Sequence, residues 1–397
     1  MTWRETSAMD ERLRFVQDVH RPGWDVAELC RRYEISRKTG YKWLARYHAH
    51  GAAGLGDGSH APRTCPHATP PAVVREILTL QKRYRWGARK VRWLLERRVA
   101  AELVPTVATV HRILERHGRV QRRRRSPRRA HPGRPLTPMD HPNAVWTADY
   151  KGEFRMGDGR YCYPLTVADG ASRFLLGCRG LLHPTLEATR PEFARLFRRY
   201  GLPERIRSDN GTPFASNALG RLSTLSVWWV QLGIWPDLIE PAHPEQNGRH
   251  ERMHKTLKAE TTRPPRADLG AQQRRFNGFR RRYNAERPHE GLHDATPASC
   301  YEPSPRSYST ALAPIAYPGH FERRRVSRNG GIRWVNRWVN VSHLLAELDV
   351  GFEAIDDRLW DVFFGPVWLG RFHEDVGRIV DHLGRPARRH GGNHKDA

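Results

Sequence analysis

Residues 204–214 read ERIRSDNGTPF, a run that predicts a short β-strand ending at Asp209, with a turn at the Asp-Asn-Gly step behind it. An earlier run, NAVWTADYKGEF at residues 143–154, predicts a second strand and places Asp149 near its end. Sheets of the α/β type carry functional sites at the ends of their strands. The two aspartates therefore predict both a sheet and the edge of that sheet at which a site lies.

The segments around these strands predict a mixed α/β layer core over residues 141–305. Residues 160–180 are typical of two strands around an Ala-Asp-Gly turn, and residues 183–201 of an amphipathic helix. Residues 236–260 predict a strand, a loop and a helix. The order of these elements indicates a sheet with helices packed against it.

The composition narrows the class of partner. The chain of 397 residues has 68 Lys and Arg against 42 Asp and Glu, a formal net charge of +26. This balance predicts a polyanionic partner, with nucleic acid ahead of an anionic membrane surface. No apolar run approaches the ~20 residues of a spanning helix, and the first residues are polar and charged, so no membrane or secreted protein is expected. Five irregularly spaced cysteines indicate reduced thiols in a cytoplasmic protein.

Residues 1–58 predict a helix-turn-helix domain. Three helical runs fill residues 9–50, with Asp25 and Ser36 as N-caps of the second and third runs. The third run, SRKTGYKWLARYH, is basic and aromatic, as expected for a helix that enters the major groove of DNA. The side chains expected to face DNA are Arg37, Lys38, Tyr41 and Lys42. An ordinary three-helix bundle with a solvated basic face is the alternative.

Residues 70–118 repeat the pattern of basic helices and predict a second helix-turn-helix domain. Two such domains in series indicate a bipartite DNA reader. The linker between them contains His60, Cys65 and His67, but a zinc site would need a fourth ligand, so a plain linker is favoured.

Residues 119–140 predict a basic linker that cannot fold alone, because its charge is dense and its apolar residues are few. We expect it to lie along the DNA backbone, and we expect its contribution to DNA-binding affinity to depend strongly on salt. A purely solubilising linker is the alternative. The arginines expected to contact DNA are Arg122, Arg123, Arg124 and Arg125.

Residues 306–385 predict a small β-barrel, since short alternating strands follow one another with turn signals between them. Hairpins are expected at Asn329-Gly330 and at Gly365-Pro366. Its basic residues suit either DNA contacts or contacts between copies of the chain. Residues 386–397 are expected to be a disordered tail.

Three blocks in this order resemble a known family: WTADYKGEF (146–154), RSDNGTPF (207–214) and HPEQNGRHERMHKTLK (243–258). The chain resembles bacterial insertion-sequence transposases that have an N-terminal helix-turn-helix and a catalytic core of the retroviral-integrase type, the DDE recombinases. Residues 27–47 resemble the DNA-binding opening of that family, and residues 281–301 the segment that closes its core. The resemblance therefore covers most of the chain.

The resemblance implies a ribonuclease-H-like fold, and two Mg²⁺ or Mn²⁺ ions held by Asp149, Asp209 and one glutamate. It also implies DNA partners (element ends and target DNA), a homo-multimer on DNA, and a place in the bacterial cytoplasm at the nucleoid. The paired His and Cys of the retroviral N-terminal zinc domain are not visible in this sequence. Residues 218–233 are an extra run, predicted to form a helix that packs Trp228 and Trp229 in the core.

The third carboxylate is either Glu245 or Glu251. Counting favours Glu245, because 35 residues separate it from Asp209, a spacing familiar in retroviral integrases. The motif favours Glu251, which follows the Gly-x-x step. An acidic residue at a helix entrance, as Glu245 is expected to be, suits the helix dipole and needs no other role.

Glu251 is expected about two turns into the helix, at about 100° per residue. Its polar face would carry three further residues, expected to contact DNA: His254, Lys255 and Lys258. A solvated Glu–Lys pair is the alternative role for Glu251. We therefore predict Asp149, Asp209 and Glu251 as the catalytic and metal-binding residues.

Taken together, the sequence predicts a DNA transposase that cleaves a phosphodiester at the end of an element and joins the freed 3′-hydroxyl to target DNA by two-metal catalysis. Two alternatives fit the same sequence. One is a catalytically silent, domesticated DNA-binding protein, and the other is a nuclease that releases ends without joining them.

Overall fold

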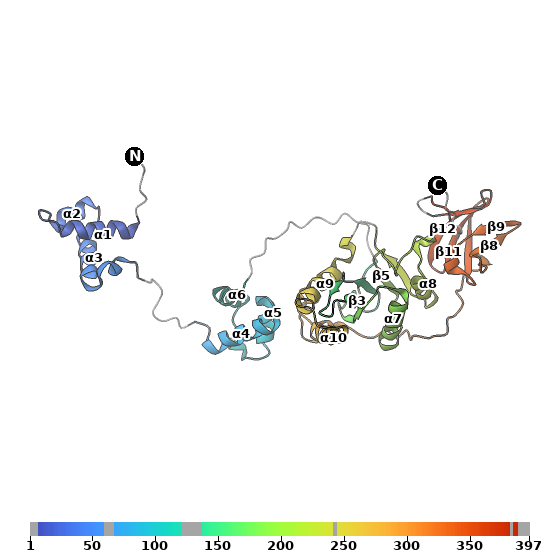
Figure 1. The fold of residues 1–397 in the computed structure, drawn as a ribbon, viewed down its shortest axis with the longest axis horizontal. Helices are drawn as coiled ribbons and strands as arrows, with labels where there is room; N and C mark the ends of the chain where they lie inside the picture. Colours follow the sequence, from blue (N-terminus) through green and yellow to red (C-terminus); the bar gives the residue numbers. More distant parts are fainter. Residues whose placement is uncertain (1–6, 59–66, 121–136, 241–243, 382–383, 388–397) are drawn as a thin grey trace. The chain divides into compact units, whose positions relative to one another are not determined.

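A computed structural model describes residues 7–58, 67–120, 137–240, 244–381 and 384–387 (Figure 1). The chain divides into two compact units, Met1–Arg75 and Glu76–Ala397, each of which is described by itself. Among the described helices, none combines the length and the apolar character needed to cross a membrane.

The first unit contains the predicted three helices, α1 (Ala8–Val19), α2 (Val26–Arg32) and α3 (Arg37–His50). Ser36 caps α3 as predicted, since its side chain accepts a hydrogen bond from the backbone N–H three residues on. Asp25 occupies the predicted N-cap position of α2, but its side chain makes no capping hydrogen bond. The helices close around a core of Phe15, Val16, Leu29, Cys30, Trp43, Leu44 and Leu55.

Three further helices follow, as predicted: α4 (Pro71–Tyr84), α5 (Ala88–Leu95) and α6 (Val107–Arg116). Thr106 caps α6, and Gly118, with a φ of 65°, lies just beyond its end. Their apolar faces supply fully buried side chains, among them Ile77, Leu80, Val91, Leu95 and Val110.

A mixed sheet forms the centre of the second unit. Its strands are β1 (Val145–Tyr150), β2 (Phe154–Arg155), β3 (Tyr161–Asp169), β4 (Leu175–Leu181), β5 (Arg205–Ser208) and β6 (Trp235–Leu238). Their order is β2-β3-β1-β5-β6, with β4 also paired to β3. β1 runs antiparallel to β3 but parallel to β5, and β5 runs parallel to β6. The predicted mixed α/β core is therefore confirmed.

Helices cover both faces of this sheet. They are α7 (Leu186–Tyr200), α8 (Thr224–Gln231), α9 (Gly248–Thr261), α10 (Leu269–Ala285) and the short α11 (Pro297–Cys300). α7 and α8 share one apolar core with the sheet, and α9 and α10 share another. Trp228 and Trp229 of α8 are buried, which confirms the predicted extra helix and its role in packing.

The C-terminal strands are β7 (Glu322–Arg325), β8 (Gly331–Trp334), β9 (Arg337–Asn340), β10 (Asp349–Asp356), β11 (Leu359–Phe364), β12 (Val367–His373) and β13 (Arg378–Val380). Five of them form a sheet in the order β13-β12-β11-β10-β7, and β8 pairs with β9. Val227 and Val230 of α8 join the apolar core of this region.

The predicted small β-barrel at residues 306–385 is wrong, because within the described residues no ladder joins β7 to β13 and the five-stranded sheet stays open. The predicted hairpin at Asn329-Gly330 is also wrong. A turn does occur there, but it connects β7, which pairs with β10, to β8, which pairs with β9. The change of sheet at this turn interrupts the continuous ladder that a barrel requires. The hairpin at Gly365-Pro366 is confirmed, with Phe364 opposite Val367.

Candidate active site

The parallel pairing of β1 with β5 brings two predicted site residues to one edge of the sheet. Ala148 lies opposite Ser208 in this ladder, so Asp149 and Asp209 each come one residue after the last matched pair. Burial raises the pKa of the Asp149 carboxyl to about 7, and the negative charge of Asp209 adds to this shift. Burial also raises the pKa of Asp209. The structure therefore brings the two carboxylates together in a partly dry environment.

Glu251 approaches the same edge from α9. The negative charge of Glu251 acts on Asp149, where it adds to the increase in pKa. The helix begins at Gly248, so Glu251 lies in its first turn, and the predicted position two turns in is wrong. Glu245 belongs to the preceding 3-10 helix η4 (Pro244–Asn247), and its side chain lies outside the described part of the structure. Glu251, Lys255 and Lys258 are all exposed, as residues on one helical face.

His254 does not share that face. Its side chain is 5% exposed, and its Nδ1 lies 3.4 Å from Oδ2 of Asp149. The prediction that His254 contacts DNA is therefore wrong, because α9 turns this side chain inward with its apolar residues. Its sequence neighbour one turn earlier, His250, is buried beside it with the ring centres 4.6 Å apart.

Two threonines of the sheet hold this histidine pair. Oγ1 of Thr166 lies 2.6 Å from Nε2 of His254 and 2.7 Å from Nε2 of His250. Oγ1 of Thr147 lies 2.8 Å from Nδ1 of His250. Burial lowers the pKa of His250 to about 3 and that of His254 to about 2, so both imidazoles are neutral at physiological pH. The sequence signal for the pair was their spacing of four residues on one helix, which our sequence prediction did not use for His250.

The donor atoms decide which metal this edge could hold. Ligand atoms of Asp149, His250 and His254 lie within 4.8 Å of one another. Both nitrogens of His250, however, already lie within hydrogen-bond distance of threonine hydroxyls, so His250 is committed to the protein. Asp149, Asp209 and Glu251 offer only carboxylate oxygens, the donors that Mg²⁺ takes. Burial raises the pKa of Asp149, and repulsion from Asp209 and Glu251 adds to this increase; a bound divalent cation would offset both effects. The residues present thus fit a hard divalent cation.

The residues predicted to contact DNA in the first unit lie on the surface of α3. Arg37, Lys38, Tyr41 and Lys42 are all exposed, Tyr41 at 59%. The ammonium of Lys42 lies 4.7 Å from the ring centre of Trp43, whose own side chain packs in the core. The predicted arginines of the arm, Arg122 to Arg125, lie outside the described residues, as do His60 and Cys65 of the linker.

Comparisons with known proteins agree with this arrangement. Residues 139–244 and residues 232–297 each match an integrase core domain family. Residues 11–63 match a helix-turn-helix domain family, and residues 39–114 a homeodomain-like domain family.

Two related proteins come from insertion elements. A 39.2 kDa protein of insertion element IS476 from Xanthomonas euvesicatoria is 28% identical over 288 residues, which cover 70% of this chain and 78% of the relative. A 31.7 kDa protein of insertion element IS407 from Burkholderia multivorans is 27% identical over 266 residues, which cover 63% of this chain and 87% of the relative.

Solved structures of viral integrases are also similar to the chain. The catalytic core domain of HTLV-2 integrase in complex with magnesium is 16% identical with a TM-score of 0.33, covering 41% of this chain and 98% of that chain. A chain of the simian T-cell lymphotropic virus intasome in complex with PP2A regulatory subunit B56 gamma is 14% identical with a TM-score of 0.36, covering 74% and 97%. The chain therefore combines matches to helix-turn-helix families with a following match to integrase core domain families, and it is similar to proteins of insertion elements.

Proposed function

We propose that this chain is a DNA transposase that binds the ends of a mobile element, cleaves a phosphodiester bond there and joins the freed 3′-hydroxyl to target DNA. One observation carries the proposal. Asp149 lies near the end of β1 and Asp209 directly follows β5, the adjacent parallel strand, and Glu251 acts on Asp149 from the first turn of α9. Three carboxylates that meet at one sheet edge are the protein's contribution to two-metal phosphodiester chemistry.

Asp149, Asp209 and Glu251 would hold two Mg²⁺ or Mn²⁺ ions. Such ions, when bound, activate the attacking oxygen and stabilise the leaving oxygen of an in-line displacement. His254 touches Asp149 and would fix the orientation of its carboxylate. Lys255 and Lys258 are exposed on the same face of α9 as Glu251, where they would contact the phosphate backbone.

DNA recognition would belong to the N-terminal helices and the arm. The exposed side chains on α3 would reach base edges in the major groove. Residues 1–58 and 70–118 would act as two reading domains, and residues 119–140 as the arm between them and a core at 141–305. Residues 306–385 would act as a separate C-terminal domain, followed by a tail at 386–397. Several copies of the chain would assemble on the two element ends, in the cytoplasm at the nucleoid.

The proposal is tested with the full chain and a labelled duplex that carries the inverted repeat flanking its gene. We expect Mg²⁺ to support cleavage of this duplex and joining of the 3′ end to plasmid DNA. Chelation of the metal, or Asp209→Asn, should abolish both steps while DNA binding stays near normal, because the amide is a poorer ligand for Mg²⁺. Cleavage that survives in chelator would overturn the site. Cleavage without joining would indicate a nuclease instead of a transposase.

A further inference from the structure

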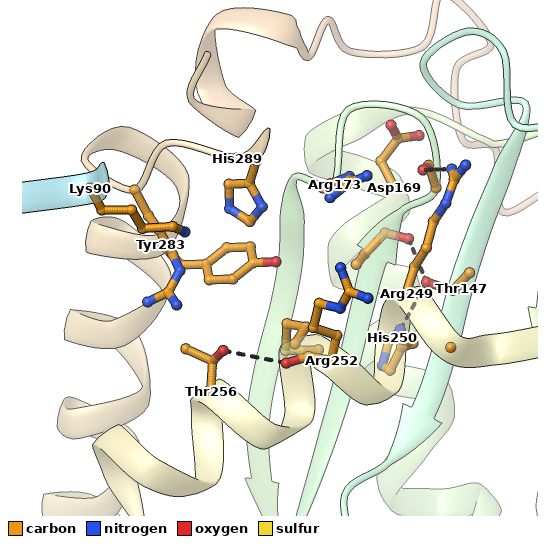
Figure 2. A pocket seen from close by; sticks show the side chains of 15 residues that line it. Lys90, Thr147, Asp169, Arg173, Arg249, His250, Arg252, Thr256, Tyr283 and His289 are labelled. Atoms are coloured by element: carbon orange, nitrogen blue, oxygen red, sulfur yellow. Dashed lines mark hydrogen bonds between the residues drawn. The ribbon is translucent and has the colours of Figure 1, made fainter. Parts of the chain in front are cut away.

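A pocket of about 470 Å³ lies on a second face of α9, beside the edge that holds the carboxylates. Figure 2 shows the rings of Tyr283 and His289 facing Arg173 and Arg252 across it. Arg252 and Thr256 line the pocket from α9, and at about 100° per residue they lie on the helical face next to that of Glu251 and Lys255. One helix therefore serves both the carboxylate edge and the pocket.

Several of the positive charges that line the pocket have no carboxylate partner among the described residues, although Arg287 of the lining pairs with Glu260. Arg173, Arg249 and Arg252 line it, and within the described residues none of the three pairs with a carboxylate. Burial lowers the pKa of Arg173, and the positive charges of Arg249 and Arg252 lower it further. The one acidic residue of the lining is Asp169. It accepts hydrogen bonds from the backbone of Asn143 at 2.7 Å and from the hydroxyl of Ser172 at 2.6 Å.

Two buried polar atoms without partners belong to residues that line this pocket. His289 is 8% exposed, and its Nε2 has no hydrogen-bond partner. The Nε of Arg173 is buried without a partner as well. The pocket also receives the N-terminal turn of the 14-residue helix α9 through Gly248, where the helix dipole favours an anion. A buried polar group without a partner costs free energy, and an anionic ligand would supply that partner.

We propose that this pocket binds a phosphodiester of the DNA backbone, separate from the phosphodiester that meets the carboxylates. The volume leaves room for a phosphate together with its flanking sugars, and the arginines supply the forked donors that phosphate oxygens prefer. DNA is favoured over a free phosphate because the two faces of α9 are adjacent, so a strand that reaches Glu251 also passes Arg252. The choice of DNA as ligand rests on the proposed function.

The test measures binding of a 30-base-pair duplex to the full chain in chelator, over a range of salt concentrations. Arg252→Gln removes one pocket charge from an exposed side chain, and Arg263→Gln is the control, an exposed arginine outside the pocket lining. Each phosphate contact contributes about 0.9 to the slope of log affinity against log salt. We expect Arg252→Gln to reduce the slope by about one and to weaken binding roughly tenfold at 0.1 M salt. Arg263→Gln should leave both unchanged, and Arg252→Lys should retain the slope.

Equal effects of Arg252→Gln and Arg263→Gln, or no effect of either, would overturn the proposal. A second arm compares inorganic phosphate with chloride at equal ionic strength and follows thermal unfolding. If phosphate stabilises the wild type but not Arg252→Gln while the salt slopes agree, the pocket is a site for free phosphate and the DNA proposal fails. Because metal is chelated throughout, a negative result in this binding assay does not bear on the proposed cleavage activity. Likewise, the cleavage assay with Asp209→Asn does not bear on DNA binding in the pocket.

Discussion

At the scale of single residues, Asp149 is a carboxyl that the fold destabilises in its ionised form, the form that a metal ion requires. Burial and the charges of Asp209 and Glu251 raise its pKa to about 7, so the ionised carboxylate is held in an unfavourable place. Such strain at a site is retained where function requires it. The imidazole of His254, whose Nε2 lies 2.6 Å from the hydroxyl of Thr166, places its Nδ1 3.4 Å from this carboxylate.

The shift of Asp149 gives a pH-dependent difference in stability. The ordinary pKa of this carboxyl is 3.8, so its raised folded value favours the protonated folded state. That stabilisation is complete below about pH 4 and is lost as the pH rises through about 7. We therefore expect Asp149→Asn to unfold at a higher temperature than the wild type at pH 8 in chelator, by the equivalent of up to a few kcal/mol. At pH 5 the difference should be smaller, because the folded carboxyl is then protonated and only the unfolded state is ionised.

Added Mg²⁺ should reduce this difference at pH 8, because a bound cation stabilises the folded wild type and finds a weaker site in the variant. Thermal unfolding at the two pH values, with and without metal, measures both effects. If the difference in stability between Asp149→Asn and the wild type were the same at pH 5 and pH 8, Asp149 would not be a buried carboxyl with a raised pKa.

At the scale of elements, the sequence predicted what depends on local pattern. The order of the elements from β1 to α9, the extra helix with Trp228 and Trp229, and the turn at Gly365-Pro366 follow from periodicity and turn chemistry, whereas β2 and α10 were not predicted. The open C-terminal sheet, where a closed barrel was predicted, could not be foreseen in this way, because closure depends on which distant strands pair. The inward turn of His254 depends on how α9 packs against β3. His254 is polar and close to Glu251 in a helical projection, but it faces the core because the hydroxyl of Thr166 supplies a hydrogen-bond partner there.

The β11–β12 turn allows a test of one element. Gly365 has a φ of 53°, and a Cβ there would lie 2.8 Å from Cγ1 of Val230 in α8. Gly365→Ala should therefore destabilise the protein by about 1–2 kcal/mol, from backbone strain and from contact with α8. Gly319→Ala is the control, because a Cβ at that position meets no atom within 4 Å. Urea unfolding of both variants measures the effect, and equal midpoints would contradict the description of this turn.

At the scale of the whole molecule, the features that suit DNA binding and those that suit catalysis lie in different parts of the chain. The net charge of +26 favours any DNA, while exposed side chains on α3 offer a means to select a sequence. The three carboxylates lie in the second unit, two of them at the ends of β1 and β5 and the third on α9. Binding and chemistry should therefore be separable.

A fragment of residues 1–140 tests this separation. We expect it to bind the inverted repeat in preference to random duplex, with an affinity that falls steeply as salt increases, because several phosphate contacts each release counterions. Competition with unlabelled random DNA measures the preference, and the variant Tyr41→Ala should reduce it. Equal binding of the fragment to every duplex at moderate salt would contradict sequence-selective binding and would indicate attraction by charge alone.

The proposed function depends on Asp149, Asp209 and Glu251 forming the site of metal-dependent DNA cleavage. The most direct measurement compares Glu251→Gln with Glu245→Gln in the cleavage of a labelled element end, at equal DNA binding. Both variants remove one glutamate charge within six residues of each other, so they differ chiefly in position. The account predicts that Glu245→Gln cleaves like the wild type and that Glu251→Gln is inactive. An active Glu251→Gln with an inactive Glu245→Gln would contradict it.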